Sequence, residues 1–125
     1  MEMALVLPLL VAVVFGIIDF ARLFNGLIET TQAAREGVRL VAVSSADTSS
    51  DYYYNDAAVT NRAQQAAPNP AFGPSAGAVT VVRRCADKPA PDATAAVSVS
   101  FGYDPVFYSF LKKTYTRTAV MRCGG

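Results

Sequence analysis

The chain opens with an apolar run that few folds can accommodate. Sixteen uncharged, mostly apolar residues, Met3 to Ile18, make up this run. Glu2 precedes it, and the charged pair Asp19 and Arg22 follows it. A helix on the surface of a soluble core shows polar positions in every turn, whereas this run is apolar on all sides. We therefore expect a helix that is surrounded by lipid or by other helices.

As a helix, the apolar run is somewhat short of a full membrane span. Sixteen residues rise about 24 Å, against roughly 30 Å for the hydrocarbon core of a bilayer. A single-pass anchor still fits if Phe20 and Leu23 lie at the boundary and the Arg22 side chain reaches the surface. Pro8 removes one backbone hydrogen bond and is expected to bend or loosen the helix. Gly16 is a second weak point or a place for close helix contact.

The helix is expected to continue to about Val43 with a different pattern. Apolar or small residues recur at intervals of three and four and define one stripe. The members of this predicted stripe are Phe20, Phe24, Leu27, Thr31, Ala34, Val38 and Val41. Charged residues lie mainly off the stripe, so this half should lay one face on a globular head. Residues 1–45 are thus predicted to form one long helix, apolar at its start and amphipathic at its end.

The remaining sequence predicts a small head of mixed structure. Residues 46–77 are expected to form a loop with a short helix from Asp56 to Ala67. Residues 78–125 change to a period of two, which predicts an antiparallel sheet with strands at 78–86, 94–102 and 116–123. One face of the middle strand should be buried: Ala95, Val97, Val99 and Phe101. The fold class is therefore α+β, a long N-terminal helix followed by a three-stranded antiparallel head in the shape of a lollipop.

A short helix is predicted as an insert between the last two strands. Asp104 is a good N-cap and Pro105 suits the first helical position. The insert would span 105–113. Its apolar residues are expected to pack inward: Phe107, Phe110 and Leu111.

The two cysteines, Cys85 and Cys123, predict one disulfide. They are 38 positions apart, and both fall in strand-like segments. Closing a loop of that length would stabilise the fold by roughly 4 kcal/mol in the chain-entropy model. Two unpaired buried thiols are the alternative. Because the chain has no histidine, the usual zinc spacings are absent and we expect no metal site.

Composition and motifs argue against several classes of protein. Hydrophobic residues make up 52% of the chain and its net charge is only +1, which disfavours nucleic-acid binding and disorder. There is no Gly-rich phosphate loop and no nucleophile elbow, and the carboxylates are scattered. We expect neither an enzyme nor a cofactor-binding protein.

Three motifs in the first 39 residues carry a family resemblance. They are "ALVLPLL" after Glu2, "GIIDFAR" at 16–22 and "AAREGVR" at 33–39. In this order they resemble the TadE-like family of pilins and pseudopilins, from the tight-adherence (Tad) branch of type IV pili. The closing "TRTAVMRC" is more loosely similar to the terminal strand of these domains.

The resemblance implies a pilin-like life cycle. The precursor would be inserted in the inner membrane, trimmed by a prepilin peptidase, and then packed through its apolar helix into an extracellular filament. Its partners would be further copies of itself in a helical homopolymer, other pilins and the inner-membrane assembly machinery. Glu2 would meet the terminal amine of a neighbouring subunit and set the register, since a buried carboxylate needs a positive partner. Pro8 would fit the loosened helix segment of pilin filaments.

The start of the chain departs from the family pattern. No basic leader precedes Glu2, so we expect further residues upstream that the peptidase removes. As written, the basic residues follow the apolar run, and the positive-inside rule would leave the head in the cytoplasm. That orientation conflicts with the expected disulfide, and a removed basic leader resolves the conflict.

Several residues keep two interpretations at this point. Glu2 is an assembly residue or a solvated acid beside the helix dipole. Asp19 and Arg22 bridge neighbouring helices or only pair with each other at the membrane surface. The loop tyrosines form a candidate surface contact, or they pack partially on the head: Tyr52, Tyr53 and Tyr54.

The function also has alternatives. The first hypothesis is a structural subunit that polymerises into a cell-surface filament, in which Glu2, Pro8, Gly16, Asp19 and Arg22 serve assembly. A minor pilin or assembly factor of such a pilus is the second. A third is a single-pass, membrane-anchored extracytoplasmic binding module that never polymerises.

Overall fold

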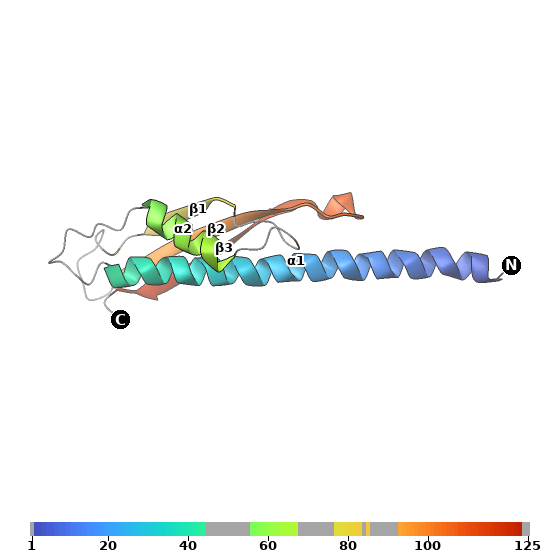
Figure 1. The fold of residues 1–125 in the computed structure, drawn as a ribbon, viewed down its shortest axis with the longest axis horizontal. Coiled ribbons are helices and arrows are strands. Elements are labelled where there is room, and N and C mark those ends of the chain that lie inside the picture. Colours follow the sequence, from blue (N-terminus) through green and yellow to red (C-terminus); the bar gives the residue numbers. More distant parts are fainter. Residues whose placement is uncertain (1, 45–55, 68–76, 84, 86–92, 124–125) are drawn as a thin grey trace.

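The structure is a computed structural model that describes residues 2–44, 56–67, 77–83, 85 and 93–123. One long helix forms the spine, and the other elements lie along one part of it, so that its N-terminal end projects alone (Figure 1). The predicted α+β class is confirmed, with a long helix followed by a three-stranded antiparallel sheet. The candidate surface contact at Tyr52, Tyr53 and Tyr54 lies outside the described residues.

The spine is the helix α1, Glu2–Ser44, which is helical throughout its 43 residues, Pro8 included. At 1.5 Å per residue it is about 64 Å long. The second helix, α2 (Asp56–Ala66), packs beside the sheet against α1 and buries Val59 and Ala63. It ends one residue before the predicted boundary.

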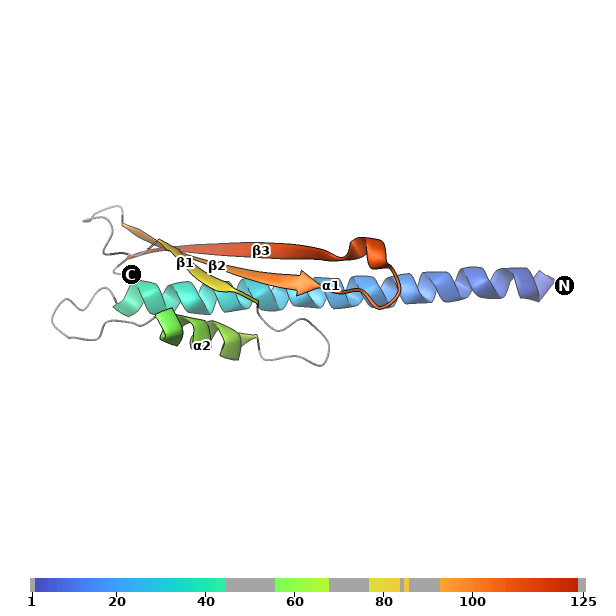
Figure 2. The same ribbon diagram turned by 90° about the horizontal axis from the view of Figure 1, so that it is seen from above.

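The sheet has the order β1-β2-β3, with all neighbours antiparallel. Its strands are β1 (Val79–Arg83), β2 (Thr94–Tyr103) and β3 (Lys113–Arg122). The β2–β3 ladder is unbroken from Thr94↔Arg122 to Tyr103↔Lys113. In contrast, β1 pairs only with the first half of β2 and is shorter than the predicted 78–86. The β2–β3 hairpin therefore extends alone toward the N-terminal end of α1 (Figure 2).

The core lies where α1, α2 and β2 meet. The predicted inward face of β2 is confirmed, because Ala95, Val97 and Val99 are fully buried and Phe101 is 1% exposed. On α1 the residues facing this strand are small or β-branched. They are Gly26, Thr30, Ala33, Gly37, Val38 and Val41. The one buried hydroxyl among them, that of Thr30, donates to the Gly26 carbonyl at 2.6 Å.

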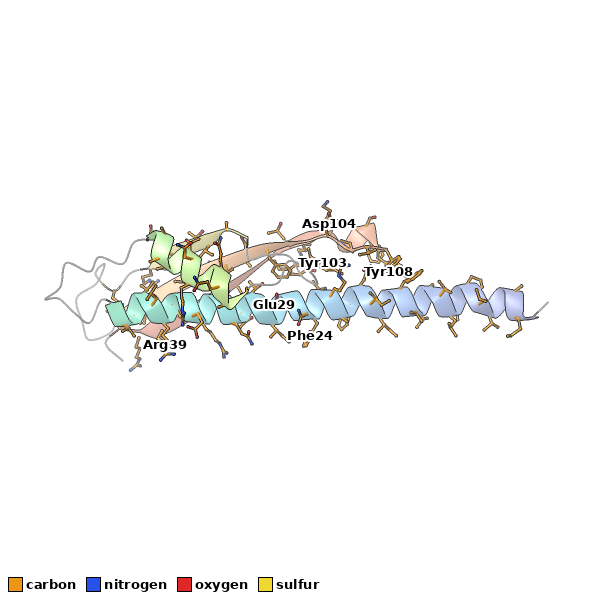
Figure 3. The ribbon with its side chains drawn as sticks, viewed as in Figure 1. Phe24, Glu29, Arg39, Tyr103, Asp104 and Tyr108 are labelled. Atoms are coloured by element: carbon orange, nitrogen blue, oxygen red, sulfur yellow. A yellow bond between two sulfur atoms is a disulfide. The ribbon has the colours of Figure 1, made fainter. Side chains whose placement is uncertain are left out.

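The predicted core-facing stripe of α1 is wrong in its first half. Phe20 and Phe24 are 66% and 57% exposed, and Phe24 points away from the sheet (Figure 3). The last members, Ala34, Val38 and Val41, are buried as expected. The physical reason is size, because a sheet approaches a helix closely only over small side chains, and large aromatic rings would hold the two apart.

The predicted helical insert at 105–113 is also wrong. The segment contains two bends at Val106 and Phe107 and then a single 3-10 turn, η2 (Ser109–Leu111). Phe110 is 80% exposed rather than packed inward. Phe107 is 43% exposed, and the Leu111 side chain lies outside what the structure describes. The backbone N–H groups that would have begun this helix have a different partner, on α1.

Candidate functional site

The connection between β2 and β3, residues 104–112, is called here the hairpin tip. It lies beside α1 at the level of Ala12 to Asp19, within and just past the apolar run. The Asp19 carboxylate and the aromatic side chains of the tip make the contacts between the two segments. Residues from the last third of the chain thus cover one side of the helix that the sequence assigned to lipid or to other subunits.

Asp19 is fully buried and its carboxylate accepts three successive backbone N–H groups of the tip. Oδ1 accepts from Val106 at 3.2 Å, and Oδ2 accepts from Phe107 and Tyr108, both at 3.1 Å. Hydrogen bonds to an ionised acceptor are stronger than those between neutral groups. The carboxylate therefore satisfies three donors that a non-helical loop would otherwise leave without partners.

Two tyrosine hydroxyls fasten the same region to carbonyl groups of α1. The Tyr103 hydroxyl donates to the Asp19 carbonyl at 2.6 Å, and the Tyr108 hydroxyl donates to the Ala12 carbonyl at 2.8 Å. Burial raises the pKa of Tyr103 above its ordinary value, and the nearby Asp19 carboxylate adds to this rise. Tyr103 thus remains a neutral donor over the physiological range of pH.

Aromatic packing completes the contact. The rings of Phe15 and Phe107 stack with centroids 3.9 Å apart and planes inclined by 9°. Beside them, a Cβ atom on Gly16 would lie 3.7 Å from the Tyr108 ring, which is ordinary van der Waals contact. Gly16 was expected to be a weak point or a place for close helix contact. In the monomer it lies against the hairpin tip.

The opposite side of α1 carries a continuous apolar surface, called here the outward stripe. Its members recur at intervals of three and four, which places them on one face of the helix. They are Val6, Leu10, Val13, Ile17, Phe20, Phe24 and Ile28, all between 44% and 66% exposed. The stripe runs for about 33 Å along the helix. It ends at Ile28, and Arg35 and Arg39 are exposed further along the same side of the helix.

The other predicted assembly residues do not meet in one place. Glu2 is the first residue of α1, and its side chain lies outside the described set. Pro8 lies in the projecting part of the helix. Arg22 is half-buried, one turn beyond Asp19. Their roles in assembly stay predictions.

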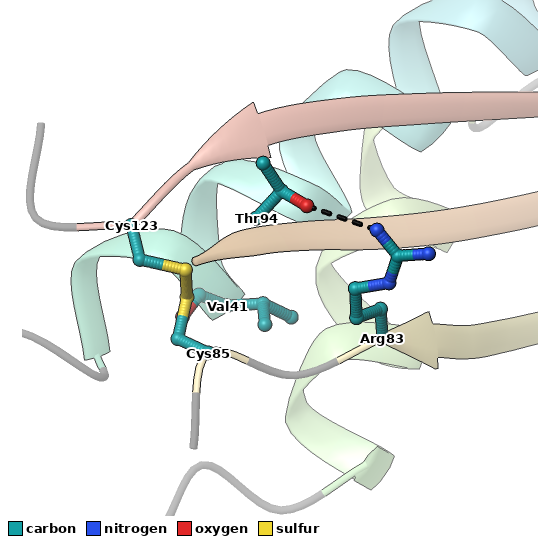
Figure 4. The surroundings of a disulfide bond; sticks show 5 residues. All are labelled: Val41, Arg83, Cys85, Thr94 and Cys123. Carbon is teal, nitrogen blue, oxygen red and sulfur yellow. Dashed lines mark hydrogen bonds between the residues drawn. A yellow bond between two sulfur atoms is a disulfide. The ribbon is translucent and has the colours of Figure 1, made fainter. Parts of the chain in front are cut away.

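The predicted disulfide between Cys85 and Cys123 is present, at the end of the sheet far from the hairpin tip (Figure 4). It lies near the C-terminal end of α1, where the Cys85 Sγ is 4.0 Å from the Val41 carbonyl oxygen. Close by, the Arg83 guanidinium donates to the Thr94 hydroxyl at 3.1 Å and ties β1 to β2. One end of the sheet is therefore cross-linked within the head, and the other end is hydrogen-bonded to α1.

Sequence reasoning missed the intramolecular role of Asp19 and the part played by Tyr103 and Tyr108. One signal was available, because small residues follow Asp19 on the same face at Gly26 and Ala33. A face of small residues that leads up to a lone carboxylate indicates that a neighbouring element lies close. The sequence could not say which element this was.

Together these features define a class: a protein with one long helix, apolar enough to cross a membrane, and a small disulfide-linked head along its second half. Within the helix segment Val6–Val43, a window of 18 residues has a mean hydropathy of 2.2, so by length and composition α1 could cross a membrane. Residues 1–39 match the model of the family described as TadE-like protein, so the resemblance is confirmed over this N-terminal part of the chain. Comparison with curated proteins gave no match, and comparison with solved structures gave none either.

Proposed function

We propose that this protein is a structural, pilin-like subunit that polymerises through α1 into a Tad-type filament on the cell surface. The observation that carries the proposal is the outward stripe. Phe20, Phe24 and Ile28 are 66%, 57% and 44% exposed, on the side of α1 away from the head. A contiguous apolar surface of this kind marks a contact with another molecule or with lipid.

The position of these three residues favours contact with another copy. Phe20 directly follows Asp19, and Phe24 and Ile28 lie beyond Arg22, beside the part of α1 that already carries the globular head. A lone anchor whose head stood in water would gain nothing from apolar side chains there. Burying one such side chain between subunits contributes about 1.5 to 3 kcal/mol. The stripe continues from the membrane segment into the part of α1 that carries the head, so neighbouring helices can pack along both parts of the helix.

The remaining parts of the proposal are supported by the match of residues 1–39 to the TadE-like family. Before assembly the subunit resides in the inner membrane through α1, and a prepilin peptidase trims its leader. Other pilins and the inner-membrane assembly machinery then bring it into an extracellular filament. Glu2 sets the register against a neighbour's terminal amine.

The test uses the native cells and compares two substitutions at exposed positions. Filaments are sheared from the surface, imaged by cryo-electron microscopy, and analysed by mass spectrometry together with the membrane fraction. Phe24→Ser should abolish incorporation into filaments while leaving the protein in the membrane. The matched control, Val82→Ser on β1, removes a side chain that is 59% exposed but lies off the stripe, and should leave filaments intact.

Two other outcomes would support the alternative functions. If the chain is scarce in filaments but their number falls without it, the minor-pilin alternative holds. If the chain is absent from filaments and Phe24→Ser changes nothing, the protein is an anchored binding module and the proposal is wrong. Glu2→Gln gives an independent reading, because a charge at this position matters for a polymer and hardly for a lone anchor.

A further inference from the structure

The hairpin tip exposes apolar side chains where a loop in water would show polar ones. Phe110 is 80% exposed, Val106 is 57% exposed and Phe107 is 43% exposed. They lie together at the end of a hairpin that runs toward the N-terminal end of α1 (Figure 1). This surface is separate from the outward stripe, which faces away from the sheet.

The level of the tip along α1 identifies what surrounds it. At 1.5 Å per residue, Ala12 lies about 15 Å and Asp19 about 26 Å from Glu2 along the helix axis. The hydrocarbon core of a bilayer is roughly 30 Å thick. When α1 crosses a membrane with Glu2 at one boundary, Ala12 falls at the bilayer midplane and Asp19 inside the opposite leaflet. Any tilt of the helix moves Asp19 deeper, so the tip cannot remain in water.

Four polar groups of the tip donate to α1, as such an environment requires. Lipid offers no hydrogen bonds, so backbone at membrane depth must find partners within the protein. The N–H groups of Val106, Phe107 and Tyr108 all donate to the Asp19 carboxylate. The Tyr108 hydroxyl donates to the Ala12 carbonyl. A loop that faced water would have no need for this set of internal acceptors.

Charged residues begin at the base of the tip. Lys112 and Asp104 form an exposed ion pair with 3.1 Å between Nζ and Oδ2, and the exposed Lys113 follows at the start of β3. Arg22 lies on α1 one turn beyond Asp19. Cations beside interfacial aromatic rings are typical of segments at the level of lipid headgroups, where they meet phosphate. The change from apolar to charged residues thus occurs at the same level on the hairpin and on the helix.

We propose that the hairpin tip is a second membrane contact: Val106, Phe107 and Phe110 enter the outer leaflet beside α1 while the subunit awaits assembly. The proposal rests on the membrane stage of the proposed function. The tip would fix the head against the bilayer and set how far α1 is inserted. On incorporation into a filament it would have to leave the lipid together with the helix.

The absence of tryptophan from the chain allows a direct test, because one introduced tryptophan is the only one present. The full-length protein is placed one copy per disc in phosphatidylcholine–phosphatidylglycerol nanodiscs, which excludes contact between copies. Three variants are compared: Phe110→Trp in the tip, Leu10→Trp in the projecting helix and Val120→Trp near the far end of β3. Val120 is 63% exposed, and it lies about 24 Å from Lys113 along the strand. Emission is measured in discs whose lipids are brominated near the headgroup or near the chain end.

The expected result is distinct for each position. Leu10→Trp should be quenched by deep bromine and Phe110→Trp by shallow bromine, both with blue-shifted emission, while Val120→Trp should keep its full emission. Quenching of Leu10→Trp without quenching of Phe110→Trp would overturn the tip contact and leave the anchor intact. Equal quenching at Phe110 and Val120 would also overturn it, because the whole head would then lie on the bilayer. If Leu10→Trp is not quenched, α1 is not inserted and the membrane stage of the proposed function fails as well.

Discussion

A single carboxylate, that of Asp19, joins two segments that are 87 to 89 residues apart in the sequence. Burial of a charge is unfavourable unless hydrogen bonds replace its hydration. Here three N–H groups do so, from the consecutive residues 106–108, which lie outside any helix or strand. The sequence offered two roles for Asp19, a bridge to a neighbouring helix and a pair with Arg22. The structure adds a third, an intramolecular acceptor that holds the hairpin on the helix.

The substitution Asp19→Asn should therefore loosen the tip. An amide of the same shape has one acceptor oxygen in place of two, and its NH₂ group faces donors rather than acceptors. Amide hydrogen exchange at Val106 to Tyr108, followed by mass spectrometry in detergent, should become faster, and the Tm should fall. The control is Asp104→Asn, which removes an exposed carboxylate at the base of the same tip and should leave both quantities unchanged. Unaltered exchange in Asp19→Asn would contradict the assigned role.

At the scale of elements, the fit between α1 and β2 depends on small residues. A Cβ atom on Gly37 would lie 3.2 Å from Val97 Cγ1 and 3.5 Å from Val59 Cγ1. At this position α1, β2 and α2 meet. Glycine costs helix propensity there, about 1 kcal/mol relative to alanine, and in return the three elements pack without a gap.

A branched side chain at Gly37 should separate these elements. Gly37→Val adds three carbon atoms where even the first is tight, and overpacking of this kind typically costs about 1 to 3 kcal/mol. The free energy of unfolding, measured with denaturant in detergent, should fall by this amount. Gln32→Val on the exposed side of the same helix should change it by less than about 0.5 kcal/mol. A loss of equal size in both variants would assign the effect to valine in a helix rather than to the contact with β2.

At the scale of the whole molecule, the β2–β3 hairpin lies along α1 (Figure 2). The Cys85–Cys123 disulfide cross-links the head near the C-terminal end of α1, and Asp19 holds the other end of the hairpin on the helix. This arrangement keeps the hairpin tip at a fixed level on the helix. Both the proposed membrane contact and the packing of copies depend on that level.

Loss of the disulfide should lower stability without changing the fold. The chain-entropy model assigns about 4 kcal/mol to a loop of this length. The double variant Cys85→Ala, Cys123→Ala should lose up to that amount of unfolding free energy. A reductant should lower the Tm of the wild-type protein and leave that of the double variant unchanged. Equal sensitivity of the two proteins to reductant would argue against the disulfide.

Much of the architecture could be predicted from local patterns. The uninterrupted apolar run indicated a long helix, and the period of two in β2 indicated a strand with Val97 and Val99 inside, because hydropathy and side-chain period are local properties. The cysteine pair was also predicted correctly. The helix predicted between β2 and β3 was wrong. Asp104 and Pro105 are a valid local signal for a helix start, but the N–H groups that follow them donate to the distant Asp19 carboxylate instead. The candidate site was predicted only in its residues, such as Asp19 and Gly16, and not in the contacts they make.

The sequence by itself determined that this chain has a helix apolar enough to span a membrane, a small antiparallel head and one disulfide. Only the tertiary structure decided which face of α1 the head occupies. Hydropathy could not do so, because the outward stripe is at least as apolar as the face toward the sheet. Close packing made the choice: the sheet lies on glycine, alanine and threonine, and the large side chains of Phe20 and Phe24 are left outside. The same packing brought the hairpin tip to Asp19, a contact between residues too far apart in the sequence for any local pattern to predict.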